Sequence, residues 1–196
     1  TRLPATETTP AAPQAMNGGA LVRVVEEALA RLDPEPVLLI DGGNIGQWAH
    51  MQLASQRYPA HWLTCGASGV VGWGVPGAMA ARLAYPERPV VLLSGDGALG
   101  FGLMEFESAA RQSLPFVAVV ADDCAWGIVA TGQERACGRR LSCELGPADY
   151  AGVAQALGGR GVRAETPQAV KDAIAEGLRD RRPTLIQVPI SVGGPA

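Results

Sequence analysis

Acidic residues with glycine at or near their side follow two of the apolar runs in this chain. Ser94-Gly95-Asp96-Gly97 comes directly after the run at residues 89–93, and Asp122-Asp123-Cys124-Ala125-Trp126-Gly127 comes after the run at residues 116–121. If these runs are neighbouring parallel strands, their carboxyl ends deliver both acidic groups to one edge of a sheet. Mg²⁺ prefers oxygen ligands and commonly joins one or two protein carboxylates to a phosphate. Because the glycines allow close backbone approach, the pattern indicates a metal-bridged diphosphate site.

Other residue types near these acids have plainer interpretations. Either aspartate taken singly is ordinary turn or helix-cap chemistry, and only their shared context favours a metal site. Cys124 is interpreted as structural, because sulfur is not a preferred ligand of magnesium. His50 and His61 have no placed partner in the sequence, so neither is predicted to be catalytic.

The elements that would position the acids alternate between helix and strand. Apolar residues at helical spacing run from residue 21 to residue 32, and the apolar run at residues 37–40 ends in Asp41-Gly42-Gly43-Asn44, which allows a sharp turn into a helix. Further strands are predicted at residues 89–93, 116–121 and 184–188, and further helices at residues 103–111, 150–157 and 167–178. Strands that are apolar throughout suit an α/β fold, with a doubly wound, mostly parallel sheet and helices on both faces.

Composition excludes several classes of function. The 196 residues are 47% hydrophobic, enough for one core, and a net charge of −3 without a dense Lys/Arg run argues against a nucleic-acid partner. The most apolar stretch, residues 70–93, is interrupted by Arg82, Glu87 and Arg88, so no membrane span is predicted. The four cysteines form no C-x-x-C pair, which argues against zinc. With so few cysteines and no signal-peptide pattern, a cytoplasmic location is expected.

Residues 1–15 differ in composition from the rest of the chain. They are rich in Thr, Pro and Ala and lack apolar periodicity, so the sequence predicts a linker or tail there and one domain over residues 16–196. The chain begins without Met. Either Met16 is near the true start, or a longer chain has lost its N-terminal part, and the sequence does not choose between these.

The segment from Gly95 through Gly127 resembles a known cofactor signature. It is similar to the thiamine diphosphate (ThDP) signature of the acetolactate synthase, pyruvate decarboxylase and benzaldehyde lyase family, in which Gly-Asp-Gly is followed by about two dozen residues and an Asn-rich turn. The resemblance extends from about Gly19 to Pro189. It implies the diphosphate-binding, or PP, domain of that family.

The resemblance also implies a set of site residues. Asp96 and Asp123 match the family's Mg²⁺ ligands, and Ala125 matches the position whose backbone carbonyl binds the same ion. Cofactor contacts are implied at Gly43, Asn44, Ile45, Val71, Gly72, Gly95, Asp96, Gly97, Ala98, Asp123, Ala125, Trp126, Gly127 and Ile128. Val71 would lie under the thiazolium and pyrimidine rings.

Some of these positions keep a structural alternative, and two depart from the family's pattern. Asn44 could equally be a helix cap, Val71 could be a core residue and Trp126 could be a packing residue. Trp126 and Gln133 are also candidates to face substrate. Asp122 stands where the family usually has Asn, and Val71 stands where it has a larger Met, Ile or Leu. Neither departure removes a required type of ligand.

The resemblance implies that this chain holds only part of an active site. In the family, the glutamate that activates the cofactor lies on a separate PYR domain, so no catalytic residue is assigned in this chain. A partner is implied, either a PYR-domain subunit in a heterodimer or heterotetramer or the N-terminal part of the same chain. Together they would form a ThDP- and Mg²⁺-dependent lyase or transferase. It would decarboxylate a 2-oxo acid and/or ligate the resulting acyl carbanion, with a 2-oxo acid or aldehyde as substrate.

Two other functions stay open on the sequence. One is a non-catalytic ThDP-binding or regulatory subunit. The other is a flavodoxin-like nucleotide-binding module, against which the segment Asp41-Gly42-Gly43-Asn44-Ile45-Gly46 lacks the G-x-G-x-x-G spacing and the chain lacks a Walker lysine.

Overall fold

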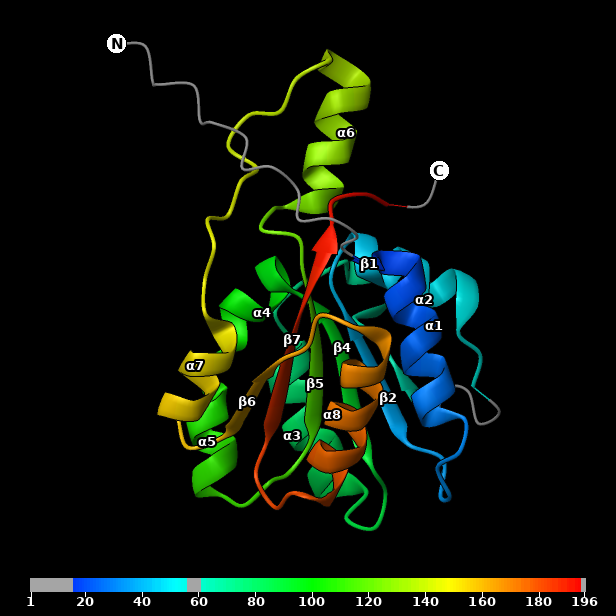
Figure 1. The fold of residues 1–196 in the computed structure, drawn as a ribbon, viewed down its shortest axis with the longest axis vertical. Helices are drawn as coiled ribbons and strands as arrows, with labels where there is room; N and C mark the ends of the chain where they lie inside the picture. Colours follow the sequence, from blue (N-terminus) through cyan, green and yellow to red (C-terminus); the bar gives the residue numbers. More distant parts are fainter. Residues whose placement is uncertain (1–15, 56–60, 195–196) are drawn as a thin grey trace.

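The computed structural model describes residues 16–55 and 61–194, and these residues form one parallel sheet (Figure 1). The strand order is β1-β7-β5-β4-β2-β3, and β6 pairs with β7. Every pairing is parallel. The strands are β1 (Met16–Asn17), β2 (Val37–Asp41), β3 (Trp62–Leu63), β4 (Val90–Gly95), β5 (Val117–Asp122), β6 (Arg160–Arg163) and β7 (Thr184–Ser191). The predicted linker at residues 1–15 lies outside the described residues.

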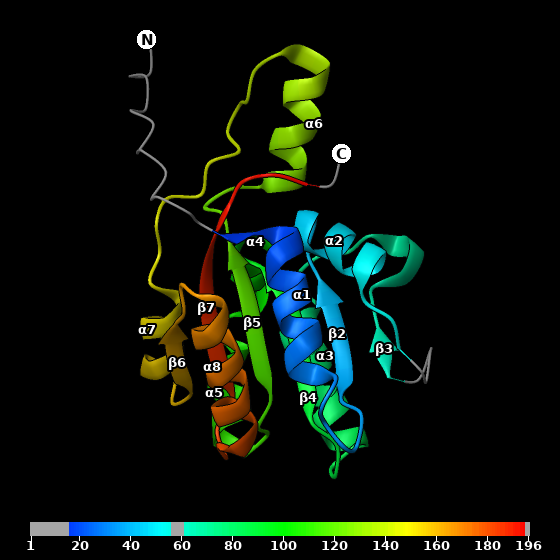
Figure 2. The ribbon, with the colours of Figure 1, turned by 45° about the vertical axis from the view of Figure 1, so that its right-hand side comes forward.

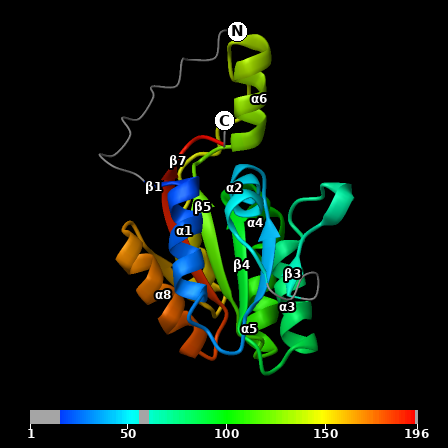
Figure 3. The same ribbon diagram turned by 90° about the vertical axis from the view of Figure 1, so that its right-hand side faces the viewer.

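Helices cover both faces of the sheet. They are α1 (Gly18–Leu29), α2 (Asn44–Gln52), α3 (Gly74–Ala84), α4 (Asp96–Gly102), α5 (Glu105–Arg111), α6 (Gly127–Cys137), α7 (Tyr150–Ala156) and α8 (Pro167–Arg179). Figure 2 shows α1 and α8 in front of the strands, and Figure 3 shows them on one side of the sheet with α3 and α5 on the other. None of these helices is long and apolar enough to cross a bilayer, a finding that covers the described residues.

The two cores explain why the central strands are apolar at every position. Side chains alternate between the faces of a strand, so a strand covered on both sides needs apolar residues at consecutive positions. In β2, Leu38 and Ile40 pack with α1 and α8, whereas Val37 and Leu39 pack with α3 and α5. The strands β4 and β5 divide their side chains in the same way. The predicted doubly wound α/β fold is therefore confirmed.

Local signals account for several helix boundaries. The side chain of Asn17 accepts a hydrogen bond from the Ala20 amide at 2.8 Å, so α1 begins three residues before the first predicted apolar position. Thr166 caps α8 in the same way, and Pro167 occupies the first turn, where its missing N–H has no cost. This helix matches its predicted range to within one residue.

The carboxyl edge of the sheet differs from the prediction in its helices. The helix predicted at residues 103–111 corresponds to α5, and a further helix that was not predicted, α4, begins at Asp96 itself. The helices α3 and α6 were also not predicted. The glycines inside both helices and the exposed surface of α6 weaken the apolar periodicity that would reveal them. In Figure 1, α6 rises beyond the carboxyl ends of the strands.

Candidate functional site

Three loops at the carboxyl edge of the sheet surround a cavity of about 280 Å³. They leave β2, β4 and β5 and lead into α2, α4 and α6. The lining residues are Gly42, Gly43, Asn44, Ile45, Val71, Gly95, Asp96, Gly97, Ala98, Ala121, Asp123, Ala125, Trp126, Gly127, Ile128, Val129 and Ile190. The structure thus brings together every predicted site residue except Gly72, which is adjacent to Val71 but does not line the cavity. A larger cavity of about 650 Å³ beside the end of α1 contains none of them.

Asp96 is the first residue of α4 and is only 3% exposed. Its Oδ1 accepts a hydrogen bond from the Gly97 amide at 2.8 Å. Its Oδ2 is buried, and no hydrogen-bond donor among the described residues reaches it. Burial raises the pKa of Asp96 to about 7, and the nearby Asp123 adds to the increase. A buried carboxylate oxygen without a donor, beside a second acid, is a place that suits a cation.

Asp123 follows the end of β5 and lines the same cavity. Its Oδ1 accepts a hydrogen bond from the Ala125 amide at 3.2 Å. Burial raises the pKa of Asp123 to about 6 even though that amide lowers it. Within the described residues, no three His, Cys, Asp or Glu side chains are arranged to hold a metal ion. A cation here would therefore take its oxygen ligands from Asp96, Asp123, a backbone carbonyl and a bound ligand.

Asp122, which departs from the family's pattern, is held by the sheet. Its Oδ2 accepts a hydrogen bond from Gln187 Nε2 at 2.7 Å, and Gln187, on β7, is fully buried. The same Nε2 donates to the Ala148 carbonyl at 2.8 Å. Asp122 is thus committed to a partner 65 residues away, so it is a supporting residue rather than a third lining acid. Gln187 was not predicted, because nothing near it in the sequence points to this contact.

The Asp123 carboxylate lies so close to residue 127 that a larger residue than glycine would displace it. A β carbon built on Gly127 would overlap Asp123 Oδ2 and would lie 2.8 Å from Asn44 Nδ2. Real β carbons are essentially never found closer than 3.0 Å to such atoms. The first residue of α6 therefore permits the Asp123 carboxylate to occupy its place.

A returning segment clamps the loop that carries Asp123. The Trp126 amide donates to the Cys143 carbonyl at 2.7 Å, and the Leu145 amide donates to the Cys124 carbonyl at 2.7 Å. Between them, Ala125 and Glu144 form an antiparallel bridge. These contacts fix the backbone next to Asp123, and no local sequence pattern announces them.

Gln133 and Trp126 have packing partners in this structure. Gln133 Oε1 accepts hydrogen bonds from the Leu141 amide at 2.7 Å and from the Cys143 thiol at 3.3 Å, so it is bound to the returning segment. The ring of Trp126 covers Gly97, where a built β carbon would lie 2.7 Å from Trp126 Cζ3. It also contacts Phe101, with ring centroids 5.9 Å apart. Trp126 thus packs against its neighbours and also lines the cavity, and its role as a cofactor or substrate contact stays a prediction.

The structure also separates the alternatives for Asn44 and Val71. The N-cap of α2 is Gly43, and Asn44 is the first helical residue, so its side chain does not cap the helix. Asn44 Nδ2 is buried without an acceptor among the described residues. Val71 is 40% exposed and lines the cavity, so it is not a core residue. His50 and His61 lie elsewhere, beside Trp62 and Tyr85 respectively.

Comparison with known proteins places this geometry in a family. Residues 41–188 match the family model described as "Thiamine pyrophosphate enzyme, C-terminal TPP binding domain". The acetolactate synthase large subunit IlvG of Mycobacterium tuberculosis is 34% identical over 168 residues, which cover 85% of this chain and 30% of that protein. Human 2-hydroxyacyl-CoA lyase 2 is 35% identical over 182 residues, covering 89% of this chain and 28% of that protein. The chain thus spans less than a third of the length of these relatives.

A solved structure shows the same fold. The thiamine diphosphate-dependent 4-hydroxybenzoylformate decarboxylase of Rhodococcus jostii RHA1 superposes with a TM-score of 0.83 at 22% identity, over 100% of this chain and 36% of that one. The family match covers the three loops of the cavity, including both aspartates, which argues against a flavodoxin-like module. The chain belongs to the thiamine pyrophosphate enzyme family, as a C-terminal TPP-binding domain.

Proposed function

We propose that this chain supplies the diphosphate- and Mg²⁺-binding half of a ThDP-dependent enzyme acting on a carbon–carbon bond next to a carbonyl. The enzyme would decarboxylate a 2-oxo acid and/or join the resulting acyl unit to an acceptor. The observation that carries the proposal is the pair Asp96 and Asp123 at one edge of the sheet. Asp96 has a buried oxygen without a donor, and the pair lies inside the region that matches the family.

The residues at this edge fit a metal-bridged diphosphate. Asp96, Asp123 and the carbonyl of Ala125 would hold the Mg²⁺. The first amides of α6, beginning at Gly127 and Ile128, have no acceptor within their own helix and would meet diphosphate oxygens. When bound, ThDP supplies the electron sink for the reaction. The chain's own contribution is to bind and orient the cofactor and to exclude water from it.

A second domain is part of the proposal because the cavity lacks a group for proton transfer. Its only titratable lining side chains among the described residues are Asp96 and Asp123, and both are assigned to the metal. Beside the cavity, Phe101 contacts the ring of Trp126 and is 67% exposed, an apolar surface that suits coverage by another domain. This chain matches only 30% of the length of its acetolactate synthase relative, so the relative contains further domains. This supports a PYR domain, on a separate subunit or elsewhere in the same chain.

Titration of ThDP into the chain tests the proposal. Calorimetry with Mg²⁺ and with chelator would compare the wild type with Asp96→Ala and Asp123→Ala. Asp172→Ala serves as a matched control, because Asp172 is exposed on α8 and, among the residues that the structure describes, pairs only with Gln168. We expect Mg²⁺-dependent binding that both site variants abolish and the control retains.

A PYR-domain partner decides between an enzyme and a non-catalytic subunit. Addition of a PYR-domain polypeptide should produce decarboxylation of a 2-oxo acid. Binding of ThDP without turnover in every such mixture would favour the regulatory subunit. Absence of ThDP binding both alone and with the partner would overturn the assignment of the cofactor.

A further inference from the structure

Asp41, the last residue of β2, is a buried acid that does not line the cavity. It is 3% exposed. Its two carboxylate oxygens accept hydrogen bonds from the Gly72 amide at 3.0 and 3.2 Å, and Oδ2 also accepts from the Gly74 amide at 2.8 Å. These contacts join the sheet to a segment 31 to 33 residues further along the chain. Asp41 therefore anchors the backbone just before α3.

The anchored segment has few other restraints. Gly69 and Gly72 both have positive φ, at 63° and 88°, and glycine in such places has more backbone freedom than any other residue. Between them, Val70 and Val71 are largely exposed. The hydrogen bonds that Asp41 accepts from the Gly72 and Gly74 amides therefore hold the backbone next to Val71 at the cavity.

The surroundings of the two amides match the carboxylate closely. A β carbon built on Gly74 would lie 2.8 Å from Asp41 Oδ2 and 2.7 Å from Leu92 Cδ1. A β carbon built on Gly72 would overlap the side chain of Phe101. Glycine at both positions allows the two amides to approach Asp41. The segment thereby packs between β2 and α4.

A neutral amide side chain replaces this carboxylate only imperfectly. The Gly72 N–H is shared by both oxygens of Asp41, so in either orientation asparagine would place its NH₂ group beside that donor. Burial raises the pKa of Asp41, while the amides of Gly74 and Gly72 lower it. The two backbone amides thus offset part of the cost of burying this carboxylate.

We infer that Asp41 is a positioning residue that holds Val71 at the cavity through the amides of Gly72 and Gly74. The inference rests on the proposed function, because its consequence is the placement of the ring portion of ThDP. The diphosphate portion would be held by Asp96 and Asp123 on other loops. Loss of Asp41 should therefore weaken binding of the whole cofactor and leave binding of its diphosphate part unchanged.

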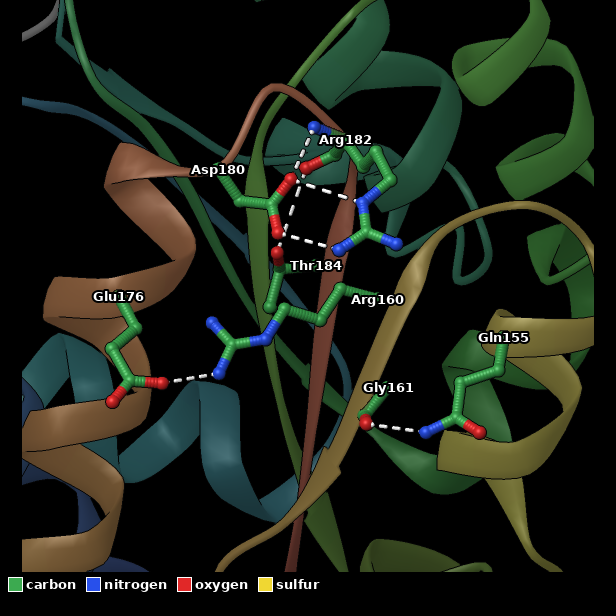
Figure 4. Close-up of polar contacts among 7 residues, drawn as sticks. All are labelled: Gln155, Arg160, Gly161, Glu176, Asp180, Arg182 and Thr184. Carbon is green, nitrogen blue, oxygen red and sulfur yellow. Dashed lines mark hydrogen bonds and ion pairs between the residues drawn. The ribbon is translucent and has the colours of Figure 1, made fainter.

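Asp180 provides a matched control at the opposite edge of the sheet. It lies between α8 and β7, where its carboxylate accepts from the Arg182 amide at 3.0 Å and pairs with the Arg182 guanidinium (Figure 4). Figure 4 also shows the neighbouring ion pair of Arg160 with Glu176. Asp180→Asn therefore makes the same chemical change as Asp41→Asn, also at a carboxylate that accepts from backbone, but away from the cavity.

The experiment titrates two probes into wild type, Asp41→Asn and Asp180→Asn, each with Mg²⁺. The probes are ThDP and inorganic pyrophosphate. For Asp41→Asn we expect ThDP affinity to fall by roughly tenfold or more, because hydrogen bonds to a charged group are lost, with pyrophosphate affinity unchanged. Amide hydrogen exchange at Gly72 and Gly74 should become faster in this variant and stay unchanged in Asp180→Asn.

A second variant keeps the inference testable if Asp41→Asn does not fold. Gly72→Ala would displace the Gly72 amide, which donates to Asp41, and would leave the Asp41 carboxylate unchanged. It should show the same selective loss of ThDP affinity. Wild-type ThDP affinity in the folded variants would overturn the inference and leave the proposed function standing. Equal loss of ThDP and pyrophosphate would also overturn it, since the damage would then be general. A wild type that binds neither probe would instead overturn the proposed function.

Discussion

Replacing Gly127 by alanine tests whether the Asp123 carboxylate must occupy its observed position. The new methyl group would overlap Asp123 Oδ2 and lie 2.8 Å from Asn44 Nδ2. The amide of Asn44 would reach the 3.0 Å limit after a shift of 0.2 Å, the difference between the two distances, whereas the carboxylate must move further. The perturbation therefore acts mainly on the predicted metal ligand.

Two opposing effects set the magnitude. Alanine in a helix is favoured over glycine by roughly 0.5–1 kcal/mol, so the helix itself gains from the change. Metal–ligand distances, in contrast, tolerate deviations of about 0.2 Å, and Mg²⁺ demands nearly ideal geometry. Disturbing groups that orient metal ligands typically lowers affinity about 10- to 100-fold. We expect a loss of this size in Mg²⁺-dependent ThDP affinity for Gly127→Ala.

The matched control lies in the same helix. Apart from its own helix, no atom of the described residues lies within 4 Å of a β carbon built on Gly132, so Gly132→Ala should keep the wild-type ThDP affinity and gain roughly 0.5–1 kcal/mol in free energy of unfolding. Calorimetry measures the affinity of each variant, and urea denaturation in chelator measures its stability. Wild-type ThDP affinity in Gly127→Ala would refute the reasoning, because the carboxylate would then have no fixed place in the site.

Two further variants test the electrostatics and the core. Because burial raises the pKa of Asp96 from 3.8 to about 7, its ionisation opposes folding of the metal-free protein. Stability should therefore fall as the pH rises from about 4 to about 7, and urea denaturation in chelator should show a smaller fall for Asp96→Asn. Phe106 is fully buried, with its ring centroid 5.3 Å from that of Phe116, so Phe106→Ala should lower the free energy of unfolding by about 3–5 kcal/mol. A loss under about 1 kcal/mol, within the range of surface changes, would contradict this packing.

The predicted fold followed mainly from the central strands. β2, β4, β5 and β7 are buried on both faces, so each appears in the sequence as an apolar run, and each begins within one residue of its predicted start. The ends of β4 and β5 extend to Gly95 and Asp122, because the strands continue into the residues that form the cavity. α6 left no such signal, since few of its residues are buried.

The candidate site was predictable where its signal is local and unpredictable where it is not. Asp96 and Asp123 follow strands directly, so strand order alone brings them together. Gln187 and Asp41 act on residues 65 and at least 31 positions away, through contacts that only the folded sheet creates. Ordinary apolar or glycine-rich neighbours surround both in the sequence. A single sequence therefore identifies the acids of the cavity but not the residues that hold the neighbouring segments in place.

The three aspartates at the end of β4 and β5 differ in how the fold treats their charge. Asp122 receives a hydrogen bond from a buried amide, whereas Asp96 keeps one buried oxygen without a donor and Asp123 faces the cavity. The fold thus provides a hydrogen-bond donor for Asp122, which supports the loop. It leaves Asp96 and Asp123 side by side in the cavity without a positive charge to balance them among the residues that line it. A cation that binds the folded chain but not the unfolded one stabilises it by mass action. Stabilisation by Mg²⁺ and ThDP together should therefore require both Asp96 and Asp123, and it would arise from the same charges that destabilise the metal-free protein.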